Sequence, residues 1–231
     1  MNIANKVLQD LVTEDLVTDR DDPDPQSGSG GHSAIRKVKI IISNDIVGRY
    51  EARSYPHDDF NGNGLTELYE VDVYRILVEG LDDTNTNQSY EFMAPRFMPY
   101  WNNPTSPDPH YKTKGWVNAG LSAKRTIVVS KYIKDYSIHN MPATSNGAIV
   151  LSGTFYIHEG PASLSDYGAG SAGCVEIVGR FEDFKETIQL LSGISGDVDL
   201  AIEKLVKAKK LIVEIETATV PNIKRRFTRE Y

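Results

Sequence analysis

The chain lacks the residues on which several common protein classes depend. Its only cysteine is Cys174, so it has no intramolecular disulfide, and a structural zinc site built on several thiolates is excluded. No apolar run approaches the length needed to cross a bilayer, and no signal peptide is visible at the N-terminus. The formal net charge of −7 leaves no basic surplus for nucleic acid. No metal site is indicated by the spacing of His32, His57, His110 and His139.

The rest of the composition predicts one large globular domain with an N-terminal appendage. Hydrophobic residues make up 40% of the chain and charged residues 25%, which is ordinary for a globular protein. Residues 1–19 have apolar positions on one helical face, and Pro23 and Pro25 then exclude further helix. We therefore expect an amphipathic helix at 1–19, a flexible acidic and Ser/Gly linker at 20–34, and one large domain at 35–231. The helix either packs back on the domain or docks to a partner.

The domain itself has the pattern of a mainly β protein. Runs rich in valine, isoleucine and tyrosine predict strands. These strands are expected at 38–42, 68–79, 126–129, 149–158, 174–178 and 211–215. Apolar residues at helical spacing predict two helices, at 181–191 and 198–208. The sequence therefore predicts a β-sandwich or distorted barrel with a helical insertion before the last strand.

Cys174 follows a short turn-like segment, and His158 ends a predicted strand upstream of it. A glycine-rich stretch joins the two strands, so the chain can cross over and bring His158 beside Cys174. An imidazole at that distance would take the thiol proton, so we expect a thiol that ionises more readily than free cysteine. The amides around Gly173 could then face an oxyanion, with Ser171 holding the turn. The alternative is packing, because free cysteine is among the most buried residue types.

The pattern of Ser171, Gly173 and Cys174 after the predicted strand 153–158, which ends on His158, resembles the signature of the L,D-transpeptidase catalytic domain (YkuD-type). In that family the cysteine forms a thioester with a peptidoglycan stem peptide, and no metal or organic cofactor is required. The resemblance implies a mainly β domain of the L,D-transpeptidase type. It also implies a nucleophile at Cys174, a base at His158, an orienting backbone carbonyl at Glu159, and an oxyanion turn shaped by Ser171 and Gly173.

Three positions depart from the pattern of that family. Ala172 stands where the family has histidine, and Glu159 stands where it has glycine after the catalytic histidine. Glu176, two residues after the cysteine, stands where the family usually has asparagine or arginine. The resemblance is specific over about thirty residues and loose elsewhere, so it implies a divergent branch with an altered substrate, or with hydrolysis in place of transfer.

We therefore expect acyl transfer on peptidoglycan stem peptides, as L,D-transpeptidase or as L,D-carboxypeptidase or endopeptidase. The expected site of action is the periplasm or cell wall, although the chain is made in the cytoplasm without a visible signal peptide. A second hypothesis is a cell-wall-targeting effector, or a phage-type lytic cargo, delivered by a secretion or injection machine through the N-terminal helix. A third is a non-catalytic β-sandwich adaptor in which Cys174 only packs.

The segment 93–114 is rich in proline and aromatic residues, which excludes a helix or central strand there. Long ordered loops are often binding loops, so Tyr100 and Trp101 are candidates for contact with sugar or peptide. The alternative is that these rings plug one end of the sandwich. Tyr156, on the histidine strand, is a third candidate for contact with the substrate.

Asp59, Asn61, Asn63, Gly64 and Glu70 have the spacing of an EF-hand calcium loop. However, the flanking residues have strand patterns, whereas an EF-hand needs flanking helices. The Asn-Gly pairs in this segment are also strong hairpin-turn signals. We therefore predict a turn in which calcium is dispensable, with a calcium loop as the alternative.

Overall fold

Strands provide most of the regular structure in the residues that the computed structural model describes. These residues are 34–53, 59, 62–99, 110–112, 121–136, 146–153, 155–168, 170 and 173–224. The predicted helix at 1–19 and all of the linker except residue 34 lie outside them. Ser171, Ala172, Tyr100, Trp101 and Asn61 also lie outside them.

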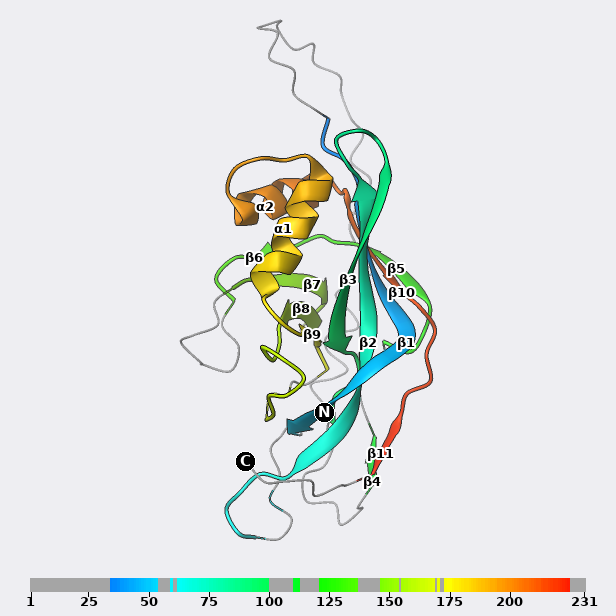
Figure 1. Ribbon diagram of the computed structural model, residues 1–231, viewed down its shortest axis with the longest axis vertical. Helices are drawn as coiled ribbons and strands as arrows, with labels where there is room; N and C mark the ends of the chain where they lie inside the picture. The colour runs from blue at the N-terminus through cyan, green and yellow to red at the C-terminus, as the bar shows by residue number, and fades with distance from the viewer. Residues whose placement is uncertain are drawn as a thin grey trace, which may run out of the picture. The chain divides into compact units, whose positions relative to one another are not determined.

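A five-stranded sheet forms the larger part of the fold, in the order β3-β2-β1-β10-β5 (Figure 1). Its strands are β1 (Val38–Arg53), β2 (Leu68–Leu81), β3 (Asn87–Pro95), β5 (Arg125–Val128) and β10 (Leu211–Ile215). β1 and β10 run parallel, and the other neighbours are antiparallel. Alternate residues at the start of β1 are buried, because successive side chains of a strand point to opposite faces.

A four-stranded sheet has the order β6-β7-β8-β9. Its strands are β6 (Tyr132–Ile133), β7 (Ala148–Ser152), β8 (Phe155–Glu159) and β9 (Val175–Ile177). The predicted strand at 149–158 is therefore two antiparallel strands, and Gly153, with a φ of 54°, lies in the turn between them. β8 and β9 are parallel, so the glycine-rich stretch between them is a crossover. β4 (His110–Lys112) and β11 (Asn222–Lys224) form a separate pair.

Two helices lie between β9 and β10, as predicted: α1 (Phe181–Ser192) and α2 (Val198–Lys207). Gly193 adopts the left-handed conformation that ends α1, and the Asp197 carboxylate accepts a hydrogen bond from the amide of Leu200 at the start of α2. The buried face of α1 belongs to the core that also includes residues of β1, β2, β8 and β9. Figure 1 shows both helices on the same side of the five-stranded sheet as β7 and β8. β10 is not the last strand, because β11 follows it.

The predicted fold class is confirmed at the level of a mainly β protein with two mixed sheets. The described strands form no closed barrel. Neither of the two described helices has the length and apolar character that a membrane span needs.

Arg96 lies fully buried at the end of β3, where it connects segments far apart in the chain. Its guanidinium donates hydrogen bonds to the backbone carbonyls of Ser43 (2.6 Å) and Leu121 (2.7 Å from Nε), and also to the carbonyl of Glu216. It stands over the ring of Tyr74, with 5.6 Å between the guanidinium carbon and the ring centroid. Burial lowers its pKa to about 10, so it stays charged near neutral pH. Arg96 therefore connects the interior of β1, the residue that follows β10 and the turn that precedes β5.

Candidate functional site

The strand pairing brings the His158 strand directly beside Cys174. In the parallel register of β8 and β9, His158 is the partner of Glu176. Two residues earlier the same register places Tyr156 beside Cys174, and a backbone hydrogen bond from Tyr156 reaches the thiol. Because residues two apart on a strand share a face, Tyr156, His158 and Glu176 lie on one face of this sheet, and Cys174, which directly precedes β9, contacts it through the hydrogen bond from the Tyr156 backbone.

His158 is held in a defined orientation. Its side chain is 1% exposed, and its Nδ1 lies 2.6 Å from the backbone carbonyl oxygen of Glu159. A carbonyl only accepts hydrogen bonds, so Nδ1 carries the proton in this contact, and Nε2 of the neutral ring is left as an acceptor. This is the contact that the family resemblance implies between the base and its orienting carbonyl.

The thiol of Cys174 is less easily ionised than the sequence predicted. Cys174 is 6% exposed, and burial raises the pKa of its thiol to about 12. The neighbouring Glu176 carboxylate also raises this pKa, whereas the Tyr156 backbone hydrogen bond lowers it. The prediction of a depressed thiol pKa is therefore wrong in this structure, because loss of water around the thiolate outweighs the hydrogen bond.

Tyr136, which the sequence analysis did not single out, covers this face. Its ring centroid lies 4.9 Å from that of Tyr156 and 5.6 Å from that of His158. Burial, together with smaller contributions from Cys174, Tyr156 and Glu176, raises the pKa of the Tyr136 phenol to about 12. Tyr136 comes from the segment after β6, far from Cys174 in the chain. Only the tertiary fold brings it here, and no local motif marks it.

Two glycines lie at the two ends of β9, Gly173 before it and Gly160 beside its last residue. Gly173 has a φ of 109°, a left-handed conformation that side chains rarely adopt, so the residue before Cys174 needs glycine for this turn. A Cβ on Gly160 would lie 2.7 Å from the carbonyl oxygen of Ile177, which a side chain cannot do without displacing the backbone. The Gly160 amide donates to the same carbonyl at 2.8 Å. The crossover thus leaves β8 in close contact with β9. Ser171, the other residue of the predicted oxyanion turn, lies outside the described residues.

Tyr100 and Trp101, the predicted substrate contacts of the proline-rich loop, lie outside the described residues, so both stay predictions. Tyr156 lies beside Cys174, where a group bound at the thiol would meet it. Four of the site residues that the sequence analysis named therefore lie in this part of the structure: Cys174, His158, Glu159 and Tyr156.

The Asp59 segment forms a turn stabilised by its own side chains. The Asp59 carboxylate accepts hydrogen bonds from the amides of Asn63 (3.0 Å) and Gly64 (2.7 Å). Glu70, the twelfth position of the calcium-loop pattern, lies on β2 and accepts a 2.6 Å hydrogen bond from Arg49 on β1. β1 and β2 flank the segment in place of the two helices of an EF-hand. These contacts favour the turn over the calcium loop.

We therefore predict that calcium leaves the unfolding midpoint unchanged. A bound ion would stabilise the fold by mass action once its concentration exceeds its dissociation constant. The measurement is thermal unfolding with EGTA and with millimolar Ca²⁺, and Asp59→Ala is the control variant. A midpoint that rises with Ca²⁺ in the native chain, but not in Asp59→Ala, would show that the segment is a calcium site. Among the described residues, no three His, Cys, Asp or Glu side chains are grouped to hold a metal ion.

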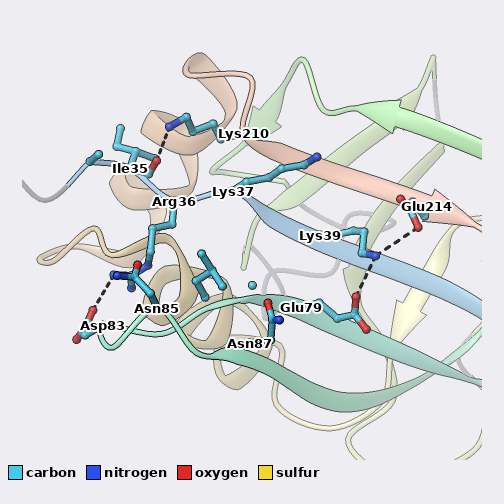
Figure 2. Close-up of a pocket in the computed structure, with 13 residues that line it drawn as sticks. Ile35, Arg36, Lys37, Lys39, Glu79, Asp83, Asn85, Asn87, Lys210 and Glu214 are labelled. Carbon is cyan, nitrogen blue, oxygen red and sulfur yellow. Dashed lines mark hydrogen bonds and ion pairs between the residues drawn. The ribbon is translucent and has the colours of Figure 1, made fainter.

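A surface pocket of about 810 Å³ lies away from this site, at the start of β1 and the end of β2 (Figure 2). Most of the cationic side chains that line this pocket form ion pairs or hydrogen bonds within the protein. Lys39 contacts Glu79 at 3.0 Å and Glu214 at 3.6 Å. The Lys210 ammonium donates to the carbonyl of Ile35. No residue of β8 or β9 lines it.

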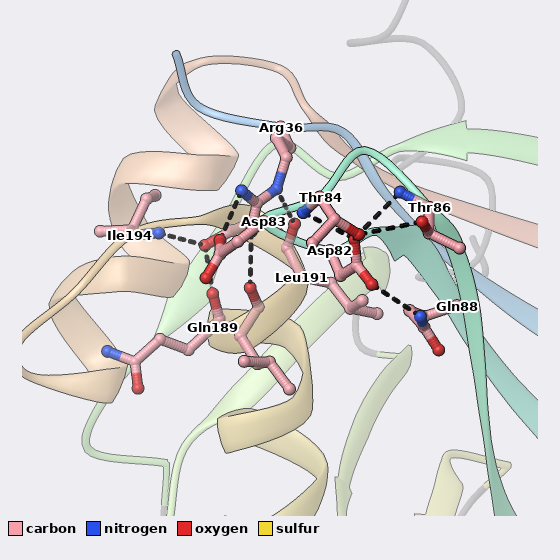
Figure 3. A network of polar contacts seen from close by, with 11 residues as sticks. Arg36, Asp82, Asp83, Thr84, Thr86, Gln88, Gln189, Leu191 and Ile194 are labelled. Atoms are coloured by element: carbon pink, nitrogen blue, oxygen red, sulfur yellow. Dashed lines mark hydrogen bonds and ion pairs between the residues drawn. The ribbon is translucent and has the colours of Figure 1, made fainter. Parts of the chain in front are cut away.

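The polar network beside this pocket joins the β2–β3 hairpin to α1 (Figure 3). The Asp82 carboxylate accepts hydrogen bonds from Thr84, Thr86 and Gln88, which lower its pKa to about 2. Arg36 contacts Asp83 at 2.8 Å, and its guanidinium also donates to the carbonyls of residues 190 and 191 at the end of α1. The network therefore has a structural role, and the thiol face remains the candidate site.

Comparisons of the chain with protein-family models, with curated proteins and with solved structures gave no match. A functional assignment therefore depends on the chemistry of the site itself. That site combines one oriented imidazole and one buried carboxylate on a single sheet face with one thiol directly before β9.

Proposed function

We propose that the chain is a cysteine-dependent acyltransferase acting on peptidoglycan stem peptides through a thioester on Cys174. The activity is that of an L,D-transpeptidase, or of an L,D-carboxypeptidase or endopeptidase when water replaces the amine acceptor. The parallel register of β8 and β9 supports this proposal, because it pairs the oriented His158 with Glu176, two residues after Cys174. The proposed architecture is a sandwich of the L,D-transpeptidase type, and the proposed site of action is the periplasm or cell wall.

The proposed reaction has two steps. In the first, the sulfur of Cys174 attacks a peptide carbonyl carbon while Nε2 of His158 takes the thiol proton. The carbon–sulfur bond forms, the carbon–nitrogen bond breaks, and His158 returns the proton to the departing amine. In the second, an amine or water attacks the thioester, and the thiol is regenerated. Backbone amides at Gly173 and Cys174 are the proposed donors to the oxyanion of each tetrahedral intermediate.

Removal of the thiol proton by His158 also compensates for the high pKa of the Cys174 thiol. An isolated thiol with a pKa of about 12 supplies very little thiolate near neutral pH. Transfer of the proton to Nε2 during the attack avoids the need for a free thiolate. The Nδ1 contact with the Glu159 carbonyl supports this role, because it stabilises the ring that becomes positively charged.

His158→Gln is expected to change the pH dependence of thiol alkylation. Without a base, the rate of alkylation by iodoacetamide should rise about tenfold per pH unit until the thiol pKa is reached. With His158 present, the rate between about pH 7 and pH 9 should be higher and should rise less steeply. Among the residues that the structure describes, the titratable groups around the thiol include His158, Tyr156, Tyr136 and Glu176.

Blocked access would lower the rate by the same factor at every pH and leave the slope unchanged. Tyr136→Phe is the matched control, since it removes a neighbouring phenol but no base. Parallel pH profiles for the native chain and His158→Gln would therefore exclude proton transfer between His158 and Cys174.

The burial of Cys174 favours a second candidate, a non-catalytic adaptor in which the cysteine fills the core. A thiol that is 6% exposed, with a raised pKa, is typical of structural cysteines. The two candidates differ in native labelling. A structural thiol reacts only after denaturation, whereas an acyltransferase reacts in its folded state.

A further inference from the structure

The imidazole of His158 packs against an aromatic ring from a distant part of the chain. Tyr136, which follows β6, has its ring centroid 5.6 Å from that of His158, with 38° between the two ring planes. The same ring lies 4.9 Å from the ring of Tyr156, which precedes His158 by two residues on β8. Tyr136 is half-buried, and His158 is 1% exposed. The tyrosine ring therefore packs on two alternate side chains of β8, one of which is the proposed base.

The hydrogen bond at Nδ1 does not by itself determine the tilt of the imidazole. That hydrogen bond, to the carbonyl of Glu159, holds one ring atom, and the χ2 torsion of histidine has a broad minimum. A ring packed against the imidazole excludes tilts toward that side. The tilt matters because Nε2 has to lie within hydrogen-bond reach of the thiol to take its proton. The packing of Tyr136 therefore bears on where Nε2 points.

The acceptor of the Nδ1 hydrogen bond is held separately, by Asn146 just before β7. The Asn146 side-chain amide donates a 2.8 Å hydrogen bond to the carboxylate of Glu159. The backbone carbonyl of the same Glu159 accepts from Nδ1 of His158 at 2.6 Å. Loss of the Tyr136 ring would therefore change the packing on the imidazole without removing the partner of Nδ1.

The chain that carries Tyr136 is anchored at Tyr132 on β6. The Tyr132 hydroxyl donates a 2.6 Å hydrogen bond to the carboxylate of Asp199 on α2. Asp199 also contacts the ammonium of Lys185 on α1 at 2.8 Å, and the Lys185 side chain is 4% exposed. A Cβ on Gly147 would overlap the Tyr132 hydroxyl, so this ring lies directly against the backbone before β7. The two helices and the sheet together therefore fix the point from which the chain reaches Tyr136.

We propose that Tyr136 is a positioning residue for the base of the proposed acyl transfer: its ring holds the His158 imidazole at the tilt that directs Nε2 to the Cys174 thiol. This inference rests on the proposed function and adds to it a residue that acts through the base. The ring acts as a flat surface, so phenylalanine should replace tyrosine. The hydroxyl transfers no proton, because burial raises the pKa of the phenol to about 12 and the proton stays on the oxygen near neutral pH.

The first measurement is the tautomer of His158, read by NMR from the ring nitrogen shifts of full-length protein that is isotopically labelled at histidine. The pH is set about two units above the ordinary histidine pKa, so that the ring is neutral. The His158 signals are those absent from His158→Gln. We expect the native chain and Tyr136→Phe to carry the proton on Nδ1. In Tyr136→Ala the imidazole should lose its hydrogen bond part of the time, and the ratio of the two tautomers should change about fivefold or more.

The second measurement is the pH profile of Cys174 alkylation by iodoacetamide. The native chain and Tyr136→Phe should show the shallow rise that base assistance gives between about pH 7 and pH 9. Tyr136→Ala should instead rise about tenfold per pH unit, as His158→Gln does. Greater access to the thiol would raise the rate by one factor at every pH, so it would not change the slope. The titratable groups around the imidazole that the structure describes, all retained in Tyr136→Ala, include Cys174, Tyr156, Glu159 and Glu176.

Tyr90→Ala is the control for the loss of a tyrosine ring. Tyr90 is 37% exposed and lies on β3, in the other sheet from His158, so its loss should leave the tautomer and the slope unchanged. Thermal unfolding of each variant shows whether it is folded. If Tyr136→Ala does not fold, Tyr136→Leu takes its place with the same expected results, because leucine keeps apolar volume but presents no flat ring.

A His158 tautomer that does not change when the Tyr136 ring is removed would overturn the proposal. A changed tautomer in Tyr136→Phe would also overturn it, because the hydroxyl and not the ring would then be responsible. A slope that stays shallow in Tyr136→Ala would show that the base acts without this ring, and would overturn it as well. Conversely, a steep profile in the native chain, with a tautomer that depends on the ring, would contradict proton transfer in the proposed function and leave the positioning of His158 intact.

Discussion

Cys174→Ala is expected to abolish turnover of peptidoglycan stem peptides while leaving the fold nearly intact. The nucleophile of the proposed reaction is lost completely, because no other cysteine is present in the chain. The change removes one sulfur atom from a buried site, so the free energy of unfolding should fall by only about 1 kcal/mol. The measurements are product formation from purified muropeptides, followed by chromatography, and thermal unfolding of both proteins.

Measuring both activity and stability of Cys174→Ala distinguishes a catalytic cysteine from a structural one. An adaptor with a structural cysteine has no turnover to lose, and the native chain itself would then be inactive. Substantial residual turnover in Cys174→Ala would show that another group carries the reaction. A large loss of stability would indicate that the thiol matters mainly for packing.

Arg96→Met is expected to lower the free energy of unfolding by about 3–5 kcal/mol, because it leaves buried carbonyls without their charged donor. Those carbonyls belong to Ser43 within β1, Leu121 in the turn before β5, and Glu216 directly after β10. Methionine keeps much of the side-chain length but can donate no hydrogen bond. The measurement is the unfolding midpoint and slope in urea.

Arg180→Met is the matched control for Arg96. Arg180 is 76% exposed and contacts Asp183 at 3.2 Å on the surface of α1. Its loss should cost less than about 0.5 kcal/mol, since exposed ion pairs contribute little. Similar losses in the two variants would show that the buried contacts of Arg96 do not hold these segments together.

Local sequence patterns predicted the parts of the fold that depend on local chemistry. β-branched runs marked the strands around Ile40 and Val213, and apolar spacing marked α1 and α2. The pairing of the His158 strand with the strand that follows Cys174 could also be anticipated, because two strands joined by a glycine-rich crossover can lie side by side. In each case the information lies within about twenty residues of the chain.

Features that depend on tertiary packing could not be predicted in this way. The sequence around Arg96 does not predict its burial, because the carbonyls that accept its hydrogen bonds belong to residues far from it in the chain, such as Ser43 and Glu216. Tyr136 reaches the thiol face only once β6 has paired with β7. The raised pKa of Cys174 depends on how completely the fold excludes water, and the motif around the cysteine carries no information about that.

Intact-protein mass spectrometry after incubation with purified muropeptides tests the central claim of thioester chemistry most directly. Acyl transfer predicts a mass increase equal to the acyl part of the donor peptide, located on Cys174, released by hydroxylamine and absent from Cys174→Ala. An unmodified Cys174 after rapid quenching, while the native chain consumes the muropeptides, would contradict a cysteine thioester as the intermediate.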